Sequence, residues 1–129
     1  MVVSTGPGGK TARAEGDYKQ DKPYTRENPG PWAGAESSHV PQITYEKMGK
    51  GLMVTVKVNH PMDPKKPHYI MWIKLEDGHG KLLGNKELMA TDPAATATFE
   101  LASVPGKLKA LQRCNIHGIW MNETDVKLK

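Results

Sequence analysis

The chain has 129 residues, a formal net charge of +4 and a single cysteine. One cysteine excludes an internal disulfide, a Cys-x-x-Cys redox pair and a metal site built from four thiolates. The lysines are spread along the sequence without a pattern of arginine and aromatic residues, which predicts a solvated surface and no nucleic-acid partner. The mild positive charge also favours the approach of a small anion.

The length fits one domain that can bury a core without disulfides. No apolar run is long enough to cross a membrane, and the first residues lack the apolar segment of a secretory signal. We therefore expect a cytoplasmic protein without a membrane partner.

Residues 1–35 are rich in glycine, proline and charged residues, which predicts an extended N-terminal arm with little core of its own. Its X-Pro dipeptides favour turns and extended chain over helix. Tyr24 and Trp32 are the side chains able to hold this arm against the rest of the protein. We expect residues 36–129 to form a single domain.

From residue 40 onward, short apolar or β-branched runs alternate with turns. The clearest run, 52–58, places its leucine and valines on one face and Thr55 and Lys57 on the other. A turn is expected at 76–80, where His79 lies between two glycines. Because no long segment has the period of a helix, we predict an all-β antiparallel sandwich. Its strands are expected at 40–45, 52–58, 69–75, 96–101, 107–113 and 116–121.

The sharpest chemical signal is the segment Cys114-Asn115-Ile116-His117. A thiolate and an imidazole three residues apart can bind one ion from a tight turn, and imidazole suits iron, copper, nickel and zinc. The pair alone is equally compatible with a cysteine that is simply a small buried apolar residue.

Three further histidines lie at the edges of predicted strands and add imidazoles to this pair. His39 opens one strand, His60 ends the next, and His68 opens the third. Three prolines stiffen the loop 60–68, so that two rings can be held at a fixed separation. Each histidine alone is compatible with a surface position, but together with the lone cysteine they predict one mononuclear metal site. Its ligands are His39, His60, His68, Cys114 and His117.

The same residues lie in longer segments that carry a resemblance to a known family. These segments are His39-Val40-Pro41, His60-Pro61-Met62, His68-Tyr69-Ile70, Trp72-Ile73 and the run from Cys114 to Trp120. Over residues 32–121, and with these segments in the same order, the chain resembles the superoxide reductases of the one-iron neelaredoxin type. That type is related to the iron-centre II domain of desulfoferrodoxin. The resemblance implies an immunoglobulin-like β-sandwich and one iron (Fe2+/Fe3+) per chain, with four equatorial imidazoles and an axial Cys114 thiolate.

The resemblance also implies a reaction and partners. Superoxide would be reduced by one electron to hydrogen peroxide, as a defence against oxidative stress, at an open sixth position opposite Cys114. It implies a rubredoxin-like electron donor and a homodimer or homotetramer. Backbone amides of Ile116 and His117 are expected to donate hydrogen bonds to the sulfur, and such bonds tune redox potential. A second iron centre, held in desulfoferrodoxins by four cysteines, is excluded by the single cysteine.

One departure from the family lies immediately before His39. Most members carry Glu-Lys there, and the lysine is thought to attract superoxide while the glutamate occupies the sixth position in the ferric state. This chain has Ser37-Ser38 instead, with Glu36 one residue further away. We hypothesise that Glu36 caps ferric iron after a shift of the loop.

A second departure is the length of the loop from His60 to His68, which is longer than is usual in the family. An insertion is tolerable where the ends of the loop still meet. Because this loop joins two ligands, Lys65 or Lys66 is our candidate to replace the missing positive charge.

Other functions fit part of the pattern. Cys114, His117 and Met121, completed by His39, have the ligand types of a blue-copper electron carrier, which leaves two histidines unexplained. A sandwich module that binds a protein partner through the N-terminal arm would need no stoichiometric metal. Dismutation of superoxide, with release of oxygen, is an alternative reaction at the same iron site.

Overall fold

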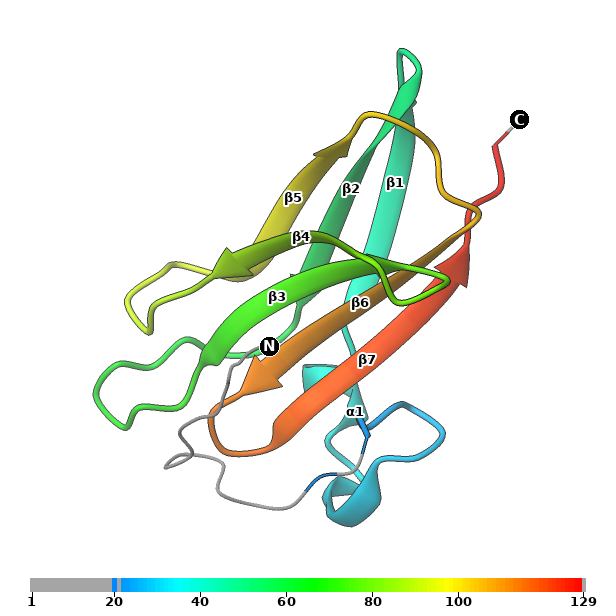
Figure 1. Ribbon diagram of the computed structural model, residues 1–129. Helices are drawn as coiled ribbons and strands as arrows, with labels where there is room; N and C mark the ends of the chain where they lie inside the picture. The colour runs from blue at the N-terminus through cyan, green and yellow to red at the C-terminus, as the bar shows by residue number, and fades with distance from the viewer. Residues whose placement is uncertain (1–19, 21, 129) are drawn as a thin grey trace.

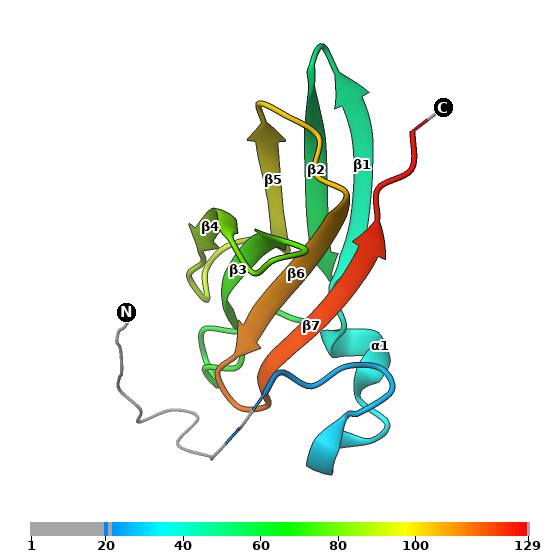
Figure 2. The ribbon, with the colours of Figure 1, turned by 45° about the vertical axis from the view of Figure 1, so that its right-hand side comes forward.

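Two antiparallel sheets face each other in a computed structural model that describes residues 20 and 22–128 (Figures 1 and 2). One sheet has the order β1-β2-β5 and the other β4-β3-β6-β7. This arrangement confirms the predicted immunoglobulin-like antiparallel sandwich. The strands are β1 (Gln42–Met48), β2 (Gly51–Val58), β3 (Ile70–Asp77), β4 (Leu82–Glu87), β5 (Ala95–Leu101), β6 (Lys107–Cys114) and β7 (Gly118–Asp125).

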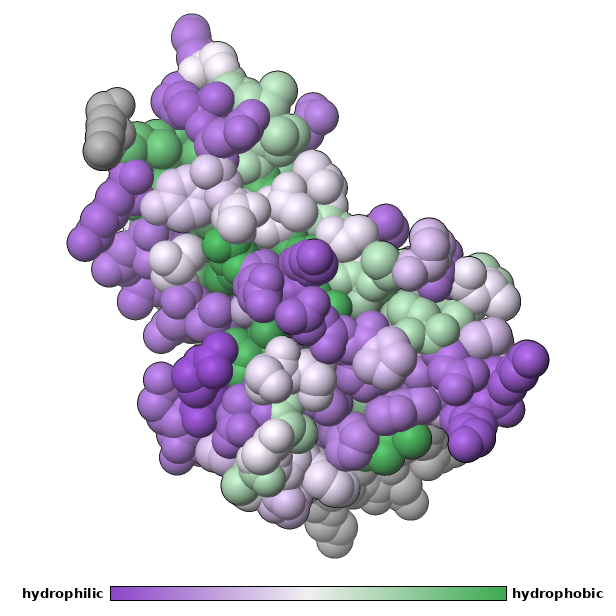
Figure 3. Space-filling view, turned by 180° about the vertical axis from the view of Figure 1, so that it is seen from behind, coloured by the Kyte–Doolittle hydropathy of each residue, from purple (hydrophilic) through white to green (hydrophobic). Residues whose placement is uncertain are grey.

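The hydrophobic core lies between the sheets. β2 alternates as predicted, with its leucine and valines buried, and β6 buries every second residue up to Cys114. Burial of these apolar side chains is the main stabilising contribution. The outer surface is polar by contrast: Figure 3 shows hydrophilic side chains over most of one face, with hydrophobic residues in small separate areas. Within the described part of the chain, no helix is long and apolar enough to span a membrane.

Among the residues that the structure describes, β4 is the one strand that the sequence did not predict. Its segment, Leu-Leu-Gly-Asn-Lys-Glu, lacks alternation and contains two residues that are uncommon in strands. Gly84 has a packing role, because a Cβ atom there would overlap the ring of Phe99 on β5. The close approach of two sheets therefore selects a glycine that weakens the local strand signal.

Two predicted strand starts are wrong, and both lie beside the candidate site. His39 does not open a strand but ends the short helix α1 (Glu36–His39), which follows a 3-10 turn, η1 (Gly30–Trp32). A helix of four residues is too short to show a helical period. Ile116 and His117 form the turn between β6 and β7, and β7 begins at Gly118, whose φ of +86° favours glycine.

The described part of the N-terminal arm packs on the sandwich through the two aromatic residues predicted to hold it. Tyr24 donates its amide to the Ile119 carbonyl at 2.9 Å and pairs in parallel with Trp120 of β7. The Trp32 ring packs edge-on against the His117 ring, with centroids 4.6 Å apart. The remainder of the predicted arm, residues 1–19, lies outside the described residues, and the domain boundary at residue 35 stays a prediction.

Candidate metal centre

The five predicted ligands lie on connections that meet at one end of the sandwich. This end carries α1, the loop from β2 to β3 and the turn from β6 to β7, at the bottom of both Figures 1 and 2. His39 ends α1, His60 and His68 lie in the β2–β3 loop, Cys114 ends β6, and His117 lies in the following turn. Segments that are far apart in sequence thus contribute to a single cluster.

The ligand atoms of these five residues all lie within 4.8 Å of one another. His39 Nε2 is 3.1 Å from His117 Nδ1, His60 Nε2 is 3.2 Å from His68 Nε2, and His68 Nε2 is 3.4 Å from His117 Nδ1. The Cys114 sulfur is 3.5 Å from both His60 Nε2 and His117 Nδ1.

These distances fit donors around one metal ion. Two imidazole nitrogens bound at a right angle, each about 2.1 Å from an ion, are about 3.0 Å apart. The nitrogen separations of 3.1, 3.2 and 3.4 Å are close to this value. One sulfur and four imidazole nitrogens are a donor set for a first-row transition metal.

The outer ring nitrogens of two histidines fix the direction of their inner lone pairs. His39 Nδ1 lies 3.0 Å from the Ala35 carbonyl oxygen, and His60 Nδ1 lies 2.6 Å from the Pro61 carbonyl oxygen. A carbonyl can only accept, so each Nδ1 carries the proton and each Nε2 presents a lone pair to the cluster. Burial lowers the pKa of His39 and His117 below 6.5, and that of His60 to about 4. These shifts favour the neutral form of the three rings, which is the form that binds a metal.

Cys114 forms the buried base of the cluster, with no exposed surface. Burial raises the pKa of its thiol, and hydrogen bonds from the backbone amides of His117 and Ile116 to the sulfur oppose that shift. A bound cation would favour the thiolate further. His68 and His117 are half-buried, and the neighbouring Ile116 is 44% exposed, so the cluster reaches solvent on their side.

Asn115 holds the segment that carries His68, a role that the sequence did not suggest. Its Nδ2 donates to the Pro67 carbonyl at 2.7 Å, and its Oδ1 accepts from the Tyr69 amide at 3.0 Å. One side chain therefore fixes the peptide groups on both sides of His68. Because Asn115 follows Cys114 directly, it couples the two ligands mechanically.

Gln112 holds the segment that carries His39 and was also missed. Its Nε2 donates to the His39 carbonyl at 2.7 Å, and the side chain is fully buried on the inward face of β6. The available signal was a polar residue in an otherwise apolar alternation, at Leu108, Ala110, Gln112 and Cys114. A buried amide at such a position needs a hydrogen-bond partner.

The long loop between His60 and His68 closes on itself. Asp63 and His68 exchange two backbone hydrogen bonds, of 3.1 and 3.0 Å. The Asp63 carboxylate also accepts from the Lys65 amide at 2.9 Å. The extra residues are thus contained in a turn whose ends meet, and His68 reaches the cluster.

The other predicted site residues lie outside this cluster. Glu36 Oε1 accepts a hydrogen bond from the Gly34 amide at 3.0 Å. Lys65 and Lys66 are exposed on the β2–β3 loop. Met121 lies on the face of β7 opposite the buried Trp120, where it lines a surface hollow together with residues of the N-terminal arm.

Acid should destabilise the metal-free protein. Burial lowers the His60 pKa from 6.5 to about 4, so between these values the unfolded chain binds a proton that the folded chain does not. The free energy of unfolding should be highest above about pH 6.5 and fall as the pH decreases toward 4, by about 3 kcal/mol from His60 alone. Urea unfolding of the chelator-treated protein between pH 7.5 and 4.5 measures this. In a His60→Gln variant the free energy of unfolding should depend less steeply on pH. An equally steep pH dependence would contradict the assignment of this effect to His60.

Comparisons with known proteins agree with this geometry. The family model described as desulfoferrodoxin matches residues 32–123. The superoxide reductase of Pyrococcus abyssi is 38% identical over 112 residues, covering 76% of this chain and 93% of that protein. The desulfoferrodoxin of Syntrophotalea carbinolica is 36% identical over 103 residues, covering 79% of this chain and 75% of that protein.

Solved structures show the same relationship. A crystal structure of a superoxide reductase in the oxidised state is 32% identical, with a TM-score of 0.62, and covers 80% of this chain and 96% of that one. The superoxide reductase (neelaredoxin) of Ignicoccus hospitalis is 28% identical, with a TM-score of 0.67, and covers 83% of this chain and 95% of that one. The sandwich of this chain ends in a cluster of four histidines and one cysteine, and the sequence of the chain matches the family model over most of its length. The chain therefore belongs to the desulfoferrodoxin family, with the neelaredoxin-type superoxide reductases among its relatives.

Proposed function

We propose that this chain is a superoxide reductase. It combines one superoxide anion, one electron and two protons into one hydrogen peroxide molecule, and releases no oxygen. The observation that carries the proposal is the convergence of four imidazole rings and one cysteine sulfur, whose ligand atoms lie within 4.8 Å of one another. The similarity of the chain to superoxide reductases in sequence and fold supports the choice of metal and substrate.

One iron ion per chain would be held by the five residues of the cluster, and when bound it supplies a one-electron ferrous–ferric couple. The hydrogen bonds from the Ile116 and His117 amides stabilise negative charge on the Cys114 sulfur. Because Cys114 is fully buried while His68 and His117 are half-buried, a small anion approaches on the side away from the sulfur. The positive net charge of the chain favours that approach.

The blue-copper alternative is disfavoured by two features of the cluster. His60 and His68, which that site does not use, have their ring nitrogens beside the other donors. Met121, its axial ligand, lies on the opposite face of β7 from Trp120, which contacts His39. Iron and not copper is therefore the expected metal.

Metal analysis followed by a stopped-flow reaction tests the proposed function. The purified protein should contain about one iron per chain, and the reduced form should consume superoxide with one peroxide formed per iron oxidised. Stoichiometric copper, or the lack of any bound metal, would contradict the proposal. Oxygen release from superoxide without an added reductant would indicate dismutation.

We further propose that Glu36 caps the ferric iron. Its carboxylate would have to give up the hydrogen bond from the Gly34 amide and turn toward the cluster. The Glu36→Ala variant should then lose the pH-dependent change in the absorption spectrum of the ferric protein. An unchanged ferric spectrum from pH 5 to pH 10 would rule out this role.

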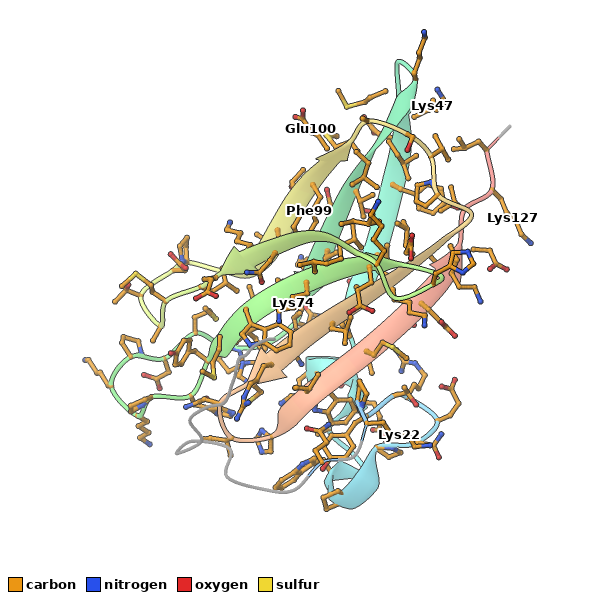
Figure 4. All side chains as sticks on the ribbon, in the orientation of Figure 1. Lys22, Lys47, Lys74, Phe99, Glu100 and Lys127 are labelled. Atoms are coloured by element: carbon orange, nitrogen blue, oxygen red, sulfur yellow. The ribbon has the colours of Figure 1, made fainter. Side chains whose placement is uncertain are left out.

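Lys65 and Lys66 are proposed to attract superoxide toward the site, since their loop joins two of the ligands. The Lys65→Ala, Lys66→Ala double variant should react with superoxide about threefold more slowly at low ionic strength, with a weaker dependence on salt. A Lys47→Ala, Lys127→Ala double variant is the matched control. It removes the same charge at positions that Figure 4 shows away from α1, so equal losses in both variants would contradict a local effect.

The partners expected from the resemblance are part of this proposal. A rubredoxin-like protein is the proposed donor that re-reduces the iron, and a homodimer or homotetramer is the proposed assembly. Sedimentation velocity measures the assembly, and reduced rubredoxin provides a direct test of the donor. The cytoplasmic location stays a prediction, as do the expected lack of nucleic-acid and membrane partners.

A further inference from the structure

Ser38 contacts the outer nitrogen of the first histidine in the cluster. It lies in the α1 turn, with its Oγ 2.9 Å from His39 Nδ1 and 3.2 Å from the Ala35 carbonyl oxygen. The same carbonyl oxygen is 3.0 Å from His39 Nδ1. These three atoms form a closed triangle on the side of the imidazole that faces away from the other donors.

The chemistry of the three groups fixes the positions of their protons. The Ala35 carbonyl can only accept, so the Ser38 hydroxyl donates to it and turns a lone pair toward His39. The proton on His39 Nδ1 is then shared between the carbonyl and the hydroxyl. This arrangement requires the tautomer in which Nε2 is unprotonated, and that atom lies 3.1 Å from His117 Nδ1 within the cluster.

Other contacts hold the backbone and the ring face of His39. The three-atom triangle therefore determines which ring nitrogen faces the other donors. Gln112 fixes the main-chain carbonyl at 2.7 Å, and the Trp120 ring packs against the imidazole with centroids 5.3 Å apart. Neither contact distinguishes the two ring nitrogens. The Ser38 hydroxyl and the Ala35 carbonyl do, because both lie against Nδ1.

We propose that Ser38 is a positioning residue for the metal centre, which holds the His39 ring and its tautomer so that Nε2 is presented to the ion. This inference rests on the proposed metal-binding function. Groups that orient a metal-binding histidine typically change metal affinity by about 10- to 100-fold. Because the Ala35 carbonyl remains in a Ser38→Ala variant, we expect the lower end of this range, about tenfold.

Metal affinity, and not activity, is the readout that tests this role. Chelator-treated protein is titrated with Co2+ in competition with a chelating indicator, and the cobalt–thiolate absorption reports binding at the site. Ser38→Ala should bind Co2+ about tenfold more weakly than the wild type. Ser38→Thr, which keeps a hydroxyl on the same carbon, should restore most of the affinity. Ser37→Ala is the matched control, because Ser37 is the exposed neighbour in the same turn.

The outcomes separate this inference from the function on which it rests. If the wild-type protein showed no cobalt–thiolate absorption on addition of Co2+, both the metal-binding function and the role of Ser38 would be overturned. Wild-type binding together with an unchanged Ser38→Ala affinity would overturn the role of Ser38 alone. A Ser38→Thr variant as weak as Ser38→Ala, or an equal loss in Ser37→Ala, would also overturn it. Circular dichroism of the metal-free variants checks that each one is folded before titration.

Discussion

Replacement of Cys114 by serine should reduce the rate of superoxide reduction by at least about 100-fold, since loss of a direct ligand should exceed the 10- to 100-fold effects of groups that only orient ligands. The change alters one atom at a fully buried position. A serine hydroxyl is not deprotonated near neutral pH, so the centre loses its soft anionic donor. Iron content and the stopped-flow rate with superoxide measure the effect, together with the disappearance of the sulfur charge-transfer absorption.

His79 provides the matched control for this prediction. It is the one histidine outside the cluster, and its amide donates to Asp77 Oδ1 at 2.8 Å in the turn after β3. A His79→Ala variant should keep its iron and its rate within about twofold, because surface changes away from a site are usually small. A Cys114→Ser variant that still reduced superoxide at a comparable rate, with full iron, would contradict the assignment of Cys114 as a ligand.

The five candidate ligands could be predicted from the sequence because each lies close to a strand end. The strands of a sandwich begin and end at its two ends. Cys114, at the end of β6, therefore lies close to His60 and His68 of the β2–β3 loop. Alternation predicted β2 and β6, where packing between the sheets imposes a period of two. It failed for β4, where Gly84 is required by contact with Phe99 and not by the strand itself.

The partners of the side chains that hold these candidate ligands could not be found in this way, because they are backbone groups from other segments. The side-chain amide of Asn115 donates to the Pro67 carbonyl next to His68, and the side-chain amide of Gln112 donates to the His39 carbonyl. Such contacts depend on how the β2–β3 loop and α1 are placed against the end of β6, which the alternation within one strand does not specify. Ser38 is a further example: the sequence shows it only as part of the pair that replaces the usual Glu-Lys, whereas the α1 turn places its hydroxyl against the His39 ring.

The positioning contacts converge on the same few ligands, and this gives the site its rigidity. His39 is held through its carbonyl by β6, through its ring face by β7, and through its outer nitrogen by Ser38 of α1 and the preceding Ala35. His117 is held through its carbonyl by the indole of Trp120. Donors restrained in this way lose little conformational freedom when a metal binds, which favours affinity.

Replacement of Trp120 by alanine should destabilise the fold and weaken metal binding together. Trp120 is fully buried, its Nε1 donates to the His117 carbonyl at 3.1 Å, and its ring packs against His39 and Tyr24. Loss of such a side chain typically costs about 3–5 kcal/mol of unfolding free energy. Urea unfolding of the metal-free protein measures this loss, and Co2+ titration measures the effect on the site.

Two further variants separate the contributions of Trp120. Trp120→Phe keeps most of the apolar surface but removes the hydrogen bond to His117, so it should cost about 1–2 kcal/mol. Trp72→Ala is the matched control, because Trp72 is half-buried on the face of β3 opposite the buried Ile73, and its ring centroid lies 4.5 Å from Lys74 Nζ. We expect a smaller loss of stability in Trp72→Ala and no change in metal affinity. If Trp72→Ala weakened metal binding as much as Trp120→Ala, the effect would be a general loss of folding, and Trp120 would have no specific role in connecting the N-terminal arm, the core and the ligands.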